Sequence, residues 1–430
     1  MKEAIAILTG GGPAPGMNTV VGSVAKTFLR KGYRVIGLHE GYTGLFNPSP
    51  RTVDIDYPMA DGIFNQGGSF LQMSRFKPTD ADFENNFNLK FFTDNNVKLL
   101  VTVGGDDTAS TANRIAKFLE AKKYPIANIH VPKTIDNDLP LPEGVPTFGF
   151  ETARAFATTE IENLMEDART TNNRWYFTIA MGRTAGHLAL GMGRSAGAAI
   201  TIIPEEFPQK KIPLQQLVDI VTGSIVKRYL TGKNYGVAVI AEGVIEKIAP
   251  EDFKKLGEVV TDEHGHIRYS ELDFGEILKQ AVLAEVKKIG IKISIIDKEI
   301  GYELRCTAPI AYDIDYARSL GYSAVRFLMR GDSGALISIQ NNEAVPMRFE
   351  DIKDPATGKT RVRKVNIKSV QYRIARGSMM RMEKEDLDDP GLANAYRMDP
   401  KAFKERYAYL FETGEEPEAA QAGKAEEKKA

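Results

Sequence analysis

The sequence predicts an α/β protein with two doubly wound, Rossmann-like lobes whose sheets are rich in parallel strands. Short, continuously apolar runs such as Ala4–Leu8 are typical of strands that are covered on both faces. Longer amphipathic stretches such as Leu214–Leu230 separate these runs, as helices do in a parallel sheet. The chain has 430 residues, which is too long for one ordinary core and favours two lobes.

The same alternation can be followed from the N-terminus onward. The expected strands are Ala4–Leu8, Tyr33–Leu38, Lys98–Val103, Ile126–Val131, Trp175–Ala180, Ala198–Ile203 and Gly236–Ala241. The expected helices are Met17–Arg30, Glu151–Ala168, Leu214–Leu230 and Phe274–Ile289. From about Glu415 the chain is rich in Ala, Glu and Lys and has no aromatic residue, which predicts a disordered tail.

Composition excludes several classes of protein. The 56 basic and 57 acidic residues give a net charge of −1, so no overall positive field favours nucleic acid or an anionic membrane. No apolar run approaches the roughly 18 residues of a membrane-spanning helix. The single cysteine, Cys306, rules out an internal disulfide and a thiolate metal site, and fits a reducing cytoplasm.

Polar clusters follow three of the predicted strands, where ligands bind in open α/β sheets. The first cluster, Gly10 to Asn18, holds four glycines within seven residues, at positions 10, 11, 12 and 16. Glycine lets the backbone approach a ligand closely, and the helix that follows offers free N–H groups to an anion. A tight turn alone needs only one or two glycines, so this cluster predicts phosphate binding.

The second cluster is Gly104-Gly105-Asp106-Asp107-Thr108. Two adjacent carboxylates beside glycines suit Mg²⁺, which takes one or two carboxylates and completes its shell with water and phosphate oxygens. The alternative is a turn with a helix cap, since Asp and Thr both cap helices well. A cap does not explain two acids in a row, and we favour the metal.

The third cluster is Lys133-Thr134-Ile135-Asp136-Asn137-Asp138. Asp136 is a candidate general base, which would take the proton of a substrate hydroxyl as its oxygen attacks phosphorus. Lys133 would act on phosphate oxygens, where negative charge accumulates. Asp138 would help to hold Mg²⁺.

In this order and spacing, the three clusters resemble the phosphofructokinase family. Further matching motifs are Met181-Gly182-Arg183, Pro204-Glu205-Glu206, Ala241-Glu242-Gly243 and Gly301-Tyr302-Glu303-Leu304-Arg305. The resemblance runs from about residue 3 to about residue 340. It implies Mg²⁺-dependent, reversible transfer of a phosphoryl group to fructose 6-phosphate, giving fructose 1,6-bisphosphate in glycolysis and gluconeogenesis. It also implies a homodimer or homotetramer.

The resemblance assigns a role to each matching residue. The residues assigned to the phosphoryl donor are Gly11, Gly12, Asp107, Thr108 and Lys133, with Asp106 and Asp138 on Mg²⁺ and Arg75 on the transferring phosphate. The residues assigned to fructose 6-phosphate are Thr134, Asp136, Met181, Gly182, Arg183, Glu242, Tyr302 and Arg305, with Arg174 contributed by a neighbouring subunit. Asp136 is the base in this scheme, and Arg183 neutralises charge.

Two of these positions bear on the identity of the donor. Many ATP-using relatives have glycine where Asp107 and Lys133 stand. A carboxylate at Asp107 would crowd and repel the α-phosphate of ATP, whereas Lys133 adds the extra positive charge that pyrophosphate needs. We therefore expect pyrophosphate as the donor, with ATP as the alternative. Tyr302 and Glu303 depart from the bacterial ATP enzymes, which have His and Gln there.

Two further alternatives belong to other classes of protein. A regulator that binds sugar phosphate without turnover is disfavoured, because a pure binder does not need the base Asp136. A dinucleotide-binding oxidoreductase is disfavoured, because the first glycine cluster does not read Gly-x-Gly-x-x-Gly.

We expect the two lobes to bind different substrates. Residues 1–147 with about 304–345 would form the donor and Mg²⁺ lobe, and residues 148–303 the sugar-phosphate lobe. Residues 346–414 would form a C-terminal extension that packs on the lobes, followed by the tail, 415–430.

Overall fold

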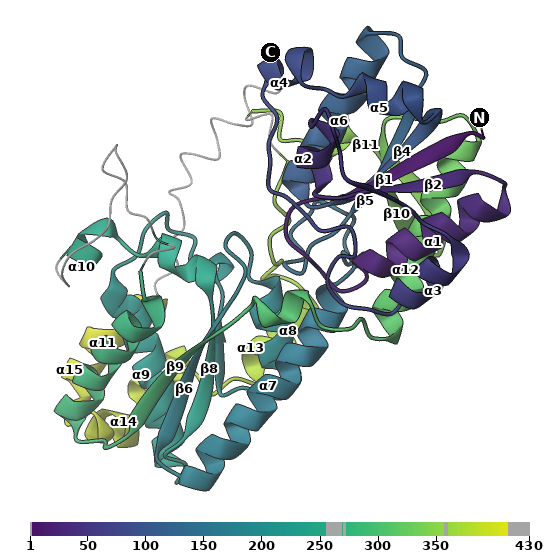
Figure 1. The fold of residues 1–430 in the computed structure, drawn as a ribbon. Coiled ribbons are helices and arrows are strands. Elements are labelled where there is room, and N and C mark those ends of the chain that lie inside the picture. Colours follow the sequence, from purple (N-terminus) through teal and green to yellow (C-terminus); the bar gives the residue numbers. More distant parts are fainter. Residues whose placement is uncertain (1, 255–268, 270–271, 357–359, 412–430) are drawn as a thin grey trace. The chain divides into compact units, whose positions relative to one another are not determined.

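The computed structural model describes residues 2–254, 269, 272–356 and 360–411. The chain divides into two compact units (Figure 1). Unit 1 comprises Met1–Thr159 and Ile300–Val365, and unit 2 comprises Glu160–Glu299 and Asn366–Ala430. The predicted tail, residues 415–430, lies outside the described residues. The donor and sugar roles of the lobes stay a prediction.

Unit 1 is built on a seven-stranded sheet with the strand order β11-β10-β5-β4-β1-β2-β3. Its strands are β1 (Ala4–Thr9), β2 (Arg34–Leu38), β3 (Thr52–Asp54), β4 (Val97–Gly104), β5 (Ala127–Pro132), β10 (Ala335–Gln340) and β11 (Glu343–Arg348). The five inner strands pair in parallel, and the two edge strands are antiparallel. The sheet is therefore parallel-rich, as the sequence predicts.

The helices of unit 1 cover this sheet. They are α1 (Met17–Arg30), α2 (Gly41–Leu45), α3 (Tyr57–Ile63), α4 (Asp80–Asn85), α5 (Leu89–Asp94), α6 (Asp106–Ala121) and α12 (Ala311–Met329). Figure 1 shows α1 and α12 packed side by side, and α6 packs against β4 and β5. All six residues of β1 are buried, which explains its unbroken apolar sequence.

Strand order gives the sheet of unit 1 a switch point at β1. The chain runs from β1 to β2 on one side, whereas β4 pairs with β1 on the other side. Neighbouring loops diverge at such a switch point and leave room at the carboxyl ends of the strands. The loops that follow β1 and β4 carry the first two polar clusters, so the fold brings them to the same edge.

A distant acid caps helix α7 (Phe150–Thr171), which begins in unit 1. Asp313 of α12 is fully buried. Its carboxylate accepts hydrogen bonds from Gly149 N (2.8 Å), Thr152 N (2.7 Å) and Thr152 Oγ1 (2.6 Å). Burial raises the pKa of Asp313 even though these bonds favour the carboxylate. The returning segment 300–365 thus fixes the start of α7.

Replacing this cap tests its contribution to stability. Asp313→Ala is expected to destabilise the protein by about 2–4 kcal/mol, because two helix-end amides and a hydroxyl lose their acceptor. The midpoint of urea denaturation measures the change. Asp315→Ala is the matched control, because Asp315 lies on the same helix, is exposed and stands 3.9 Å from Arg318. Equal midpoints for the two variants would contradict the capping role.

Unit 2 has a four-stranded sheet with the order β7-β8-β6-β9. Its strands are β6 (Arg174–Ala180), β7 (Ile200–Ile202), β8 (Gly236–Ala241) and β9 (Ser294–Ile300). Its helices are α8 (His187–Ala196), α9 (Leu214–Leu230), α10 (Pro250–Lys254), α11 (Phe274–Ile289), α13 (Val370–Gly377), α14 (Pro390–Ala395) and α15 (Pro400–Tyr407). Both β6 and β8 are fully or almost fully buried and pair in parallel.

The C-terminal segment from Asn366 packs within unit 2. The buried carboxylate of Asp219, in α9, accepts a hydrogen bond from Tyr409 Oη (2.6 Å) and lies 2.9 Å from Arg406 Nη1. Arg381 forms a second buried ion pair, with Glu206. These contacts attach the C-terminal residues to the helix layer. No described helix combines the length and the hydrophobicity that crossing a membrane requires.

Candidate active site

The glycine loop after β1 is held at the switch point by backbone hydrogen bonds. Gly10 N donates to Val103 O and Gly11 N donates to Ser74 O, both at 2.9 Å. Gly11 has a φ of 84° and Gly16 a φ of 97°, in the left-handed region that favours glycine. The loop is therefore anchored beside the ends of β1 and β4, with the N–H groups of Gly10 and Gly11 paired within the protein.

Thr108 packs against this loop. Its side chain is buried, and a Cβ on Gly10 or Gly104 would lie 3.0 Å or 2.5 Å from it. Larger residues than glycine at these two positions would displace Thr108. Tyr42 Oη donates to Thr108 O at 2.9 Å, which fixes the turn further.

His130 supports Gly104, although its sequence position in the middle of β5 gave no sign of this role. Its Nε2 donates to Gly104 O at 3.1 Å, and its Nδ1 lies 2.8 Å from Thr102 Oγ1. Burial lowers the pKa of His130 to about 3, so the imidazole is neutral. We assign it a structural role.

The two acids of the second cluster occupy the first turn of α6. Gly105 is the N-cap residue, so neither acid is the cap, and the α6 N-terminus favours negative charge there. Desolvation raises the pKa of Asp106, and the charges of Asp107 and Asp138 raise it further. Asp107 Oδ2 pairs with Lys77 Nζ at 2.8 Å, a contact that the sequence did not predict.

The third cluster follows β5 at the same edge. Lys133 N donates to Gly104 O at 2.9 Å, and a Cβ on Gly105 would lie 3.9 Å from Lys133 Nζ. Lys133 is buried, and this desolvation lowers the pKa of its ammonium to about 8. The nearby carboxylates of Asp136, Asp138 and Asp106 oppose this shift. The ammonium thus lies among the predicted site acids.

The loop that carries the predicted base is closed by local hydrogen bonds. Asp136 N donates to Thr134 Oγ1 at 3.0 Å. Thr147 Oγ1 donates to Thr134 O at 2.7 Å, and Thr147 N donates to Asn137 Oδ1 at 3.0 Å. Asp136 is half-buried, which suits a carboxylate that must remain accessible to substrate.

Arg363 holds this loop from outside and was missed by sequence analysis. Its guanidinium donates to the carbonyl oxygens of Asn137 (3.0 Å) and Val145 (2.7 Å). Its backbone N donates to Asp138 O at 2.7 Å. Desolvation lowers the pKa of Arg363. The position of Asp136 and Asp138 therefore depends on a residue more than 200 positions away.

Arg305 lies nearer the donor loop than the resemblance suggests. A Cβ on Gly12 would lie 3.6 Å from Arg305 Cζ, and the Arg305 guanidinium contributes to lowering the pKa of Lys133. The same guanidinium stacks over the ring of Tyr302 at 4.7 Å. Tyr302 itself is 70% exposed. Their assignment to the 6-phosphate stays a prediction.

Arg75 is placed by its neighbours in the chain. Asn18 donates to Gln66 O and Gly67 O (3.1 Å each) and accepts from Phe70 N (2.7 Å), which holds the preceding turn. Ser74 bonds to Gly11, and Lys77 pairs with Asp107. The backbone of Arg75 therefore runs beside the donor loop.

The acids of unit 1 fit a magnesium ion whose coordination shell is completed by the substrate. Among the described residues, no group of three or more His, Cys, Asp or Glu side chains is arranged to hold a metal. The charge of Asp138 raises the pKa of Asp106, and both carboxylates oppose the lowering of the pKa of Lys133, so the two acids lie close together. Because Mg²⁺ takes one or two carboxylates and fills its shell with water and phosphate oxygens, this pair suits it.

A second cluster of predicted residues lies in unit 2. Met181, Gly182 and Arg183 follow β6, and Glu242 follows β8, the parallel neighbour of β6. Gly243 N donates to Gly182 O at 3.3 Å, which ties the two strand ends together. Arg183 is exposed, with its Nε 4.0 Å from Glu246 Oε1. The pairing of β6 with β8 therefore brings Arg183 and Glu242 to the same edge of the sheet.

Arg174 lies at the opposite end of the same strand. It is the first residue of β6, whereas Met181 follows the last. At roughly 3.3 Å per residue, the strand spans about 20 Å from Arg174 to Ala180, beyond which Arg183 lies. Its Nη1 lies 2.7 Å from Asp167 Oδ2, which also accepts a bond from Tyr176 Oη at 2.5 Å. Within unit 2, Arg174 is therefore apart from the sugar cluster.

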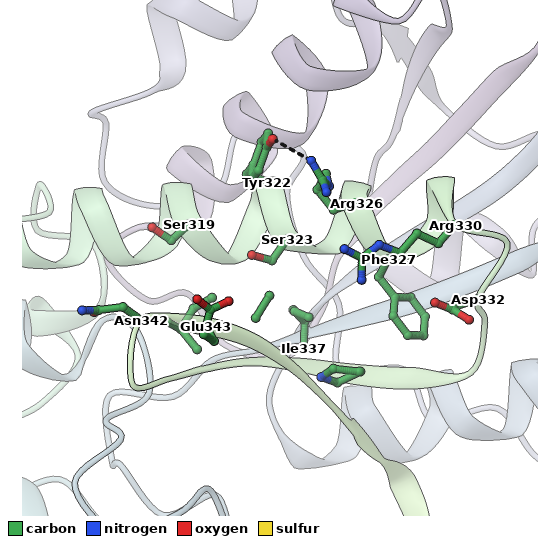
Figure 2. Close-up of a pocket in the computed structure, with 13 residues that line it drawn as sticks. Ser319, Tyr322, Ser323, Arg326, Phe327, Arg330, Asp332, Ile337, Asn342 and Glu343 are labelled. Atoms are coloured by element: carbon green, nitrogen blue, oxygen red, sulfur yellow. Dashed lines mark hydrogen bonds between the residues drawn. The ribbon is translucent and has the colours of Figure 1, made fainter.

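A separate pocket of about 580 Å³ lies between α12 and the β10–β11 hairpin (Figure 2). Figure 2 shows Arg326 beside Tyr322, with Arg326 Nη1 3.4 Å from Tyr322 Oη. Two arginines, Arg326 and Arg330, and two acids, Asp332 and Glu343, line it. None of the predicted site residues lines this pocket.

Comparison with known proteins agrees with this architecture. The family model described as Phosphofructokinase matches residues 4–328. A Thermotoga maritima protein named pyrophosphate–fructose 6-phosphate 1-phosphotransferase is 44% identical over 422 residues, covering 96% of this chain and 100% of its own. A Naegleria fowleri protein of the same name is 41% identical over 420 residues, covering 94% and 95%. The chain belongs to the phosphofructokinase family.

Solved structures support the fold. The crystal structure of a pyrophosphate-dependent phosphofructokinase from Marinobacter aquaeolei matches with a TM-score of 0.66 at 17% identity, covering 86% of this chain and 88% of that one. The predicted fold class and family resemblance are thus confirmed.

Proposed function

We propose that this protein transfers a phosphoryl group from pyrophosphate to O1 of fructose 6-phosphate, giving fructose 1,6-bisphosphate and phosphate. One observation carries the choice of donor. Asp107 and the buried ammonium of Lys133 lie at the same sheet edge as the glycine loop. A carboxylate there would crowd and repel the α-phosphate of ATP. The ammonium favours pyrophosphate, which is shorter and ends in a charged phosphate.

In this proposal the residues of unit 1 carry the chemistry. Asp136 accepts the proton of the 1-hydroxyl as its oxygen attacks phosphorus. Lys133 and Arg75 stabilise charge on the transferring phosphoryl group, and the backbone of Gly11 and Gly12 holds the donor. A magnesium ion held by Asp106 and Asp138 would supply charge neutralisation to the donor's phosphate oxygens.

The remaining assigned residues bind the sugar phosphate. Met181 and Gly182 line it, Glu242 accepts a hydroxyl, and Arg183 neutralises phosphate charge. Thr134 contacts the 1-hydroxyl, and Tyr302 and Arg305 bind the 6-phosphate.

The position of Arg174 bears on assembly. Because Arg174 lies at the far end of β6 from Arg183, its position supports a phosphate contact with a neighbouring subunit. We therefore include a homodimer or homotetramer in the proposal. The proposal also places the protein in the cytoplasm.

A parallel donor assay tests the proposal. The purified protein is incubated with fructose 6-phosphate and Mg²⁺, and fructose 1,6-bisphosphate is measured with pyrophosphate or with ATP. Turnover with pyrophosphate is expected, and EDTA should abolish it until Mg²⁺ is restored, because the donor loses its counter-ion. Turnover with ATP alone would overturn the choice of donor.

A further inference from the structure

The carboxylate that opposes ATP has a cation partner of its own. Lys77 Nζ stands 2.8 Å from Asp107 Oδ2. Both side chains are largely exposed, so the pair contributes little to the stability of the free protein. Its importance lies in its place, since Asp107 is in the first turn of α6, beside the loops that form the predicted donor site.

The segment that carries Lys77 is fixed at both ends. Ahead of it, Ser74 O accepts from Gly11 N at 2.9 Å. Behind it, Arg114 binds Pro78 O and lies 2.6 Å from Asp80 Oδ1. Arg114 stands seven residues after Asp107 on α6, so both lie on one face of the helix.

The Arg114 guanidinium also stacks over Phe83, which belongs to the core of unit 1. Residues 74–80 therefore run along α6 from the donor loop toward the core. The backbone holds Lys77 next to Asp107, so the pairing does not depend on the flexible side chain alone.

The charges explain why Asp107 needs such a partner. It adjoins Asp106, whose pKa its charge raises, and Asp138 acts on Asp106 in the same direction. An unpaired carboxylate at Asp107 would repel pyrophosphate, which is itself a polyanion, as well as ATP. A cation on Asp107 offsets the charge and leaves the side chain in place, where it blocks a longer donor.

We propose that Lys77 is a positioning residue for donor selection, which pairs with Asp107 so that this carboxylate excludes ATP without weakening the binding of pyrophosphate. This inference rests on the proposed function. It adds Lys77 to Asp107 and Lys133 as a determinant of the donor.

The first experiment separates this role from a structural one. Lys77→Gln should raise the KM for pyrophosphate about tenfold, because the carboxylate loses its partner. The KM for fructose 6-phosphate and kcat should stay within about twofold of wild type. Lys77→Arg should restore the KM for pyrophosphate, since it restores the charge. Lys122→Gln is the matched control, because Lys122 pairs with Glu84 at 3.0 Å at the other end of α6.

A double-mutant cycle tests whether Lys77 acts through Asp107. In an Asp107→Asn background, Lys77→Gln should change the KM for pyrophosphate less than about twofold, because no carboxylate remains to be paired. Calorimetric affinity for methylene diphosphonate should follow the same pattern. Equal effects in both backgrounds, or no effect in either, would overturn the role of Lys77.

The two proposals fail in different ways. Wild-type turnover with pyrophosphate but no coupling between Lys77 and Asp107 overturns this inference alone. A wild-type protein that neither turns over pyrophosphate nor binds the diphosphonate overturns the proposed function and this inference with it.

Discussion

Asp136→Asn should lower kcat with fructose 6-phosphate by at least about 10²-fold, or about 2.7 kcal/mol of transition-state stabilisation. The amide keeps the shape of the side chain but cannot accept the hydroxyl proton. Asp136 suits this role because the loop around it is closed by Thr134, Thr147 and Arg363, so its carboxylate keeps its place. Single-turnover measurement at saturating substrates isolates the chemical step.

The fold must be intact for this result to bear on catalysis. Circular dichroism and the affinity for fructose 6-phosphate should match those of wild type. Asp332→Asn serves as the matched control, because Asp332 precedes β10 and lies at the opposite sheet edge from the site. Near-normal turnover of Asp136→Asn would remove Asp136 as the base.

Exchanging both donor-selecting residues should reverse the donor preference. Asp107→Gly combined with Lys133→Gly is expected to change the ratio of kcat/KM for pyrophosphate to that for ATP by at least about 10³-fold. The carboxylate that repels the nucleotide is removed, and pyrophosphate loses a buried ammonium. Steady-state kinetics with each donor at fixed fructose 6-phosphate gives the ratio.

The single variants separate the two contributions. Asp107→Gly should mainly raise kcat/KM for ATP, and Lys133→Gly should mainly lower it for pyrophosphate. A double variant that loses activity with both donors by the same factor would contradict selection by these residues.

The sequence predicted the helices and strands that are determined by residues close together in the chain. Helices α1, α9 and α11 and strand β8 have the predicted bounds, because their apolar spacing and flanking glycines are sufficient signals. β7 is shorter than predicted at both ends. Strand β10 was not predicted, because its parallel partner β5 lies about 200 residues earlier in the chain and no short pattern reveals that pairing.

The candidate site was predicted in the same uneven way. The clusters at 10–16, 104–108 and 133–138 could be found because each follows a strand. Lys77 and Arg363 could not, since each contacts its target only after the chain has folded, 30 and more than 200 residues away. The local sequence around Tyr302 and Arg305 indicates no function, so only the family resemblance assigned them a role.

The place of β10 in the sheet also has a consequence for biosynthesis. Strand β5 is complete at Pro132, but its outer partner begins only at Ala335. At about 5–20 residues per second, a ribosome needs roughly 10–40 s to make the intervening chain. During that time β5 is an edge with unpaired backbone groups, open to wrong pairing between nascent chains. Slower elongation between the two strands should therefore lower the soluble yield, and a chaperone that shields strand edges should restore it.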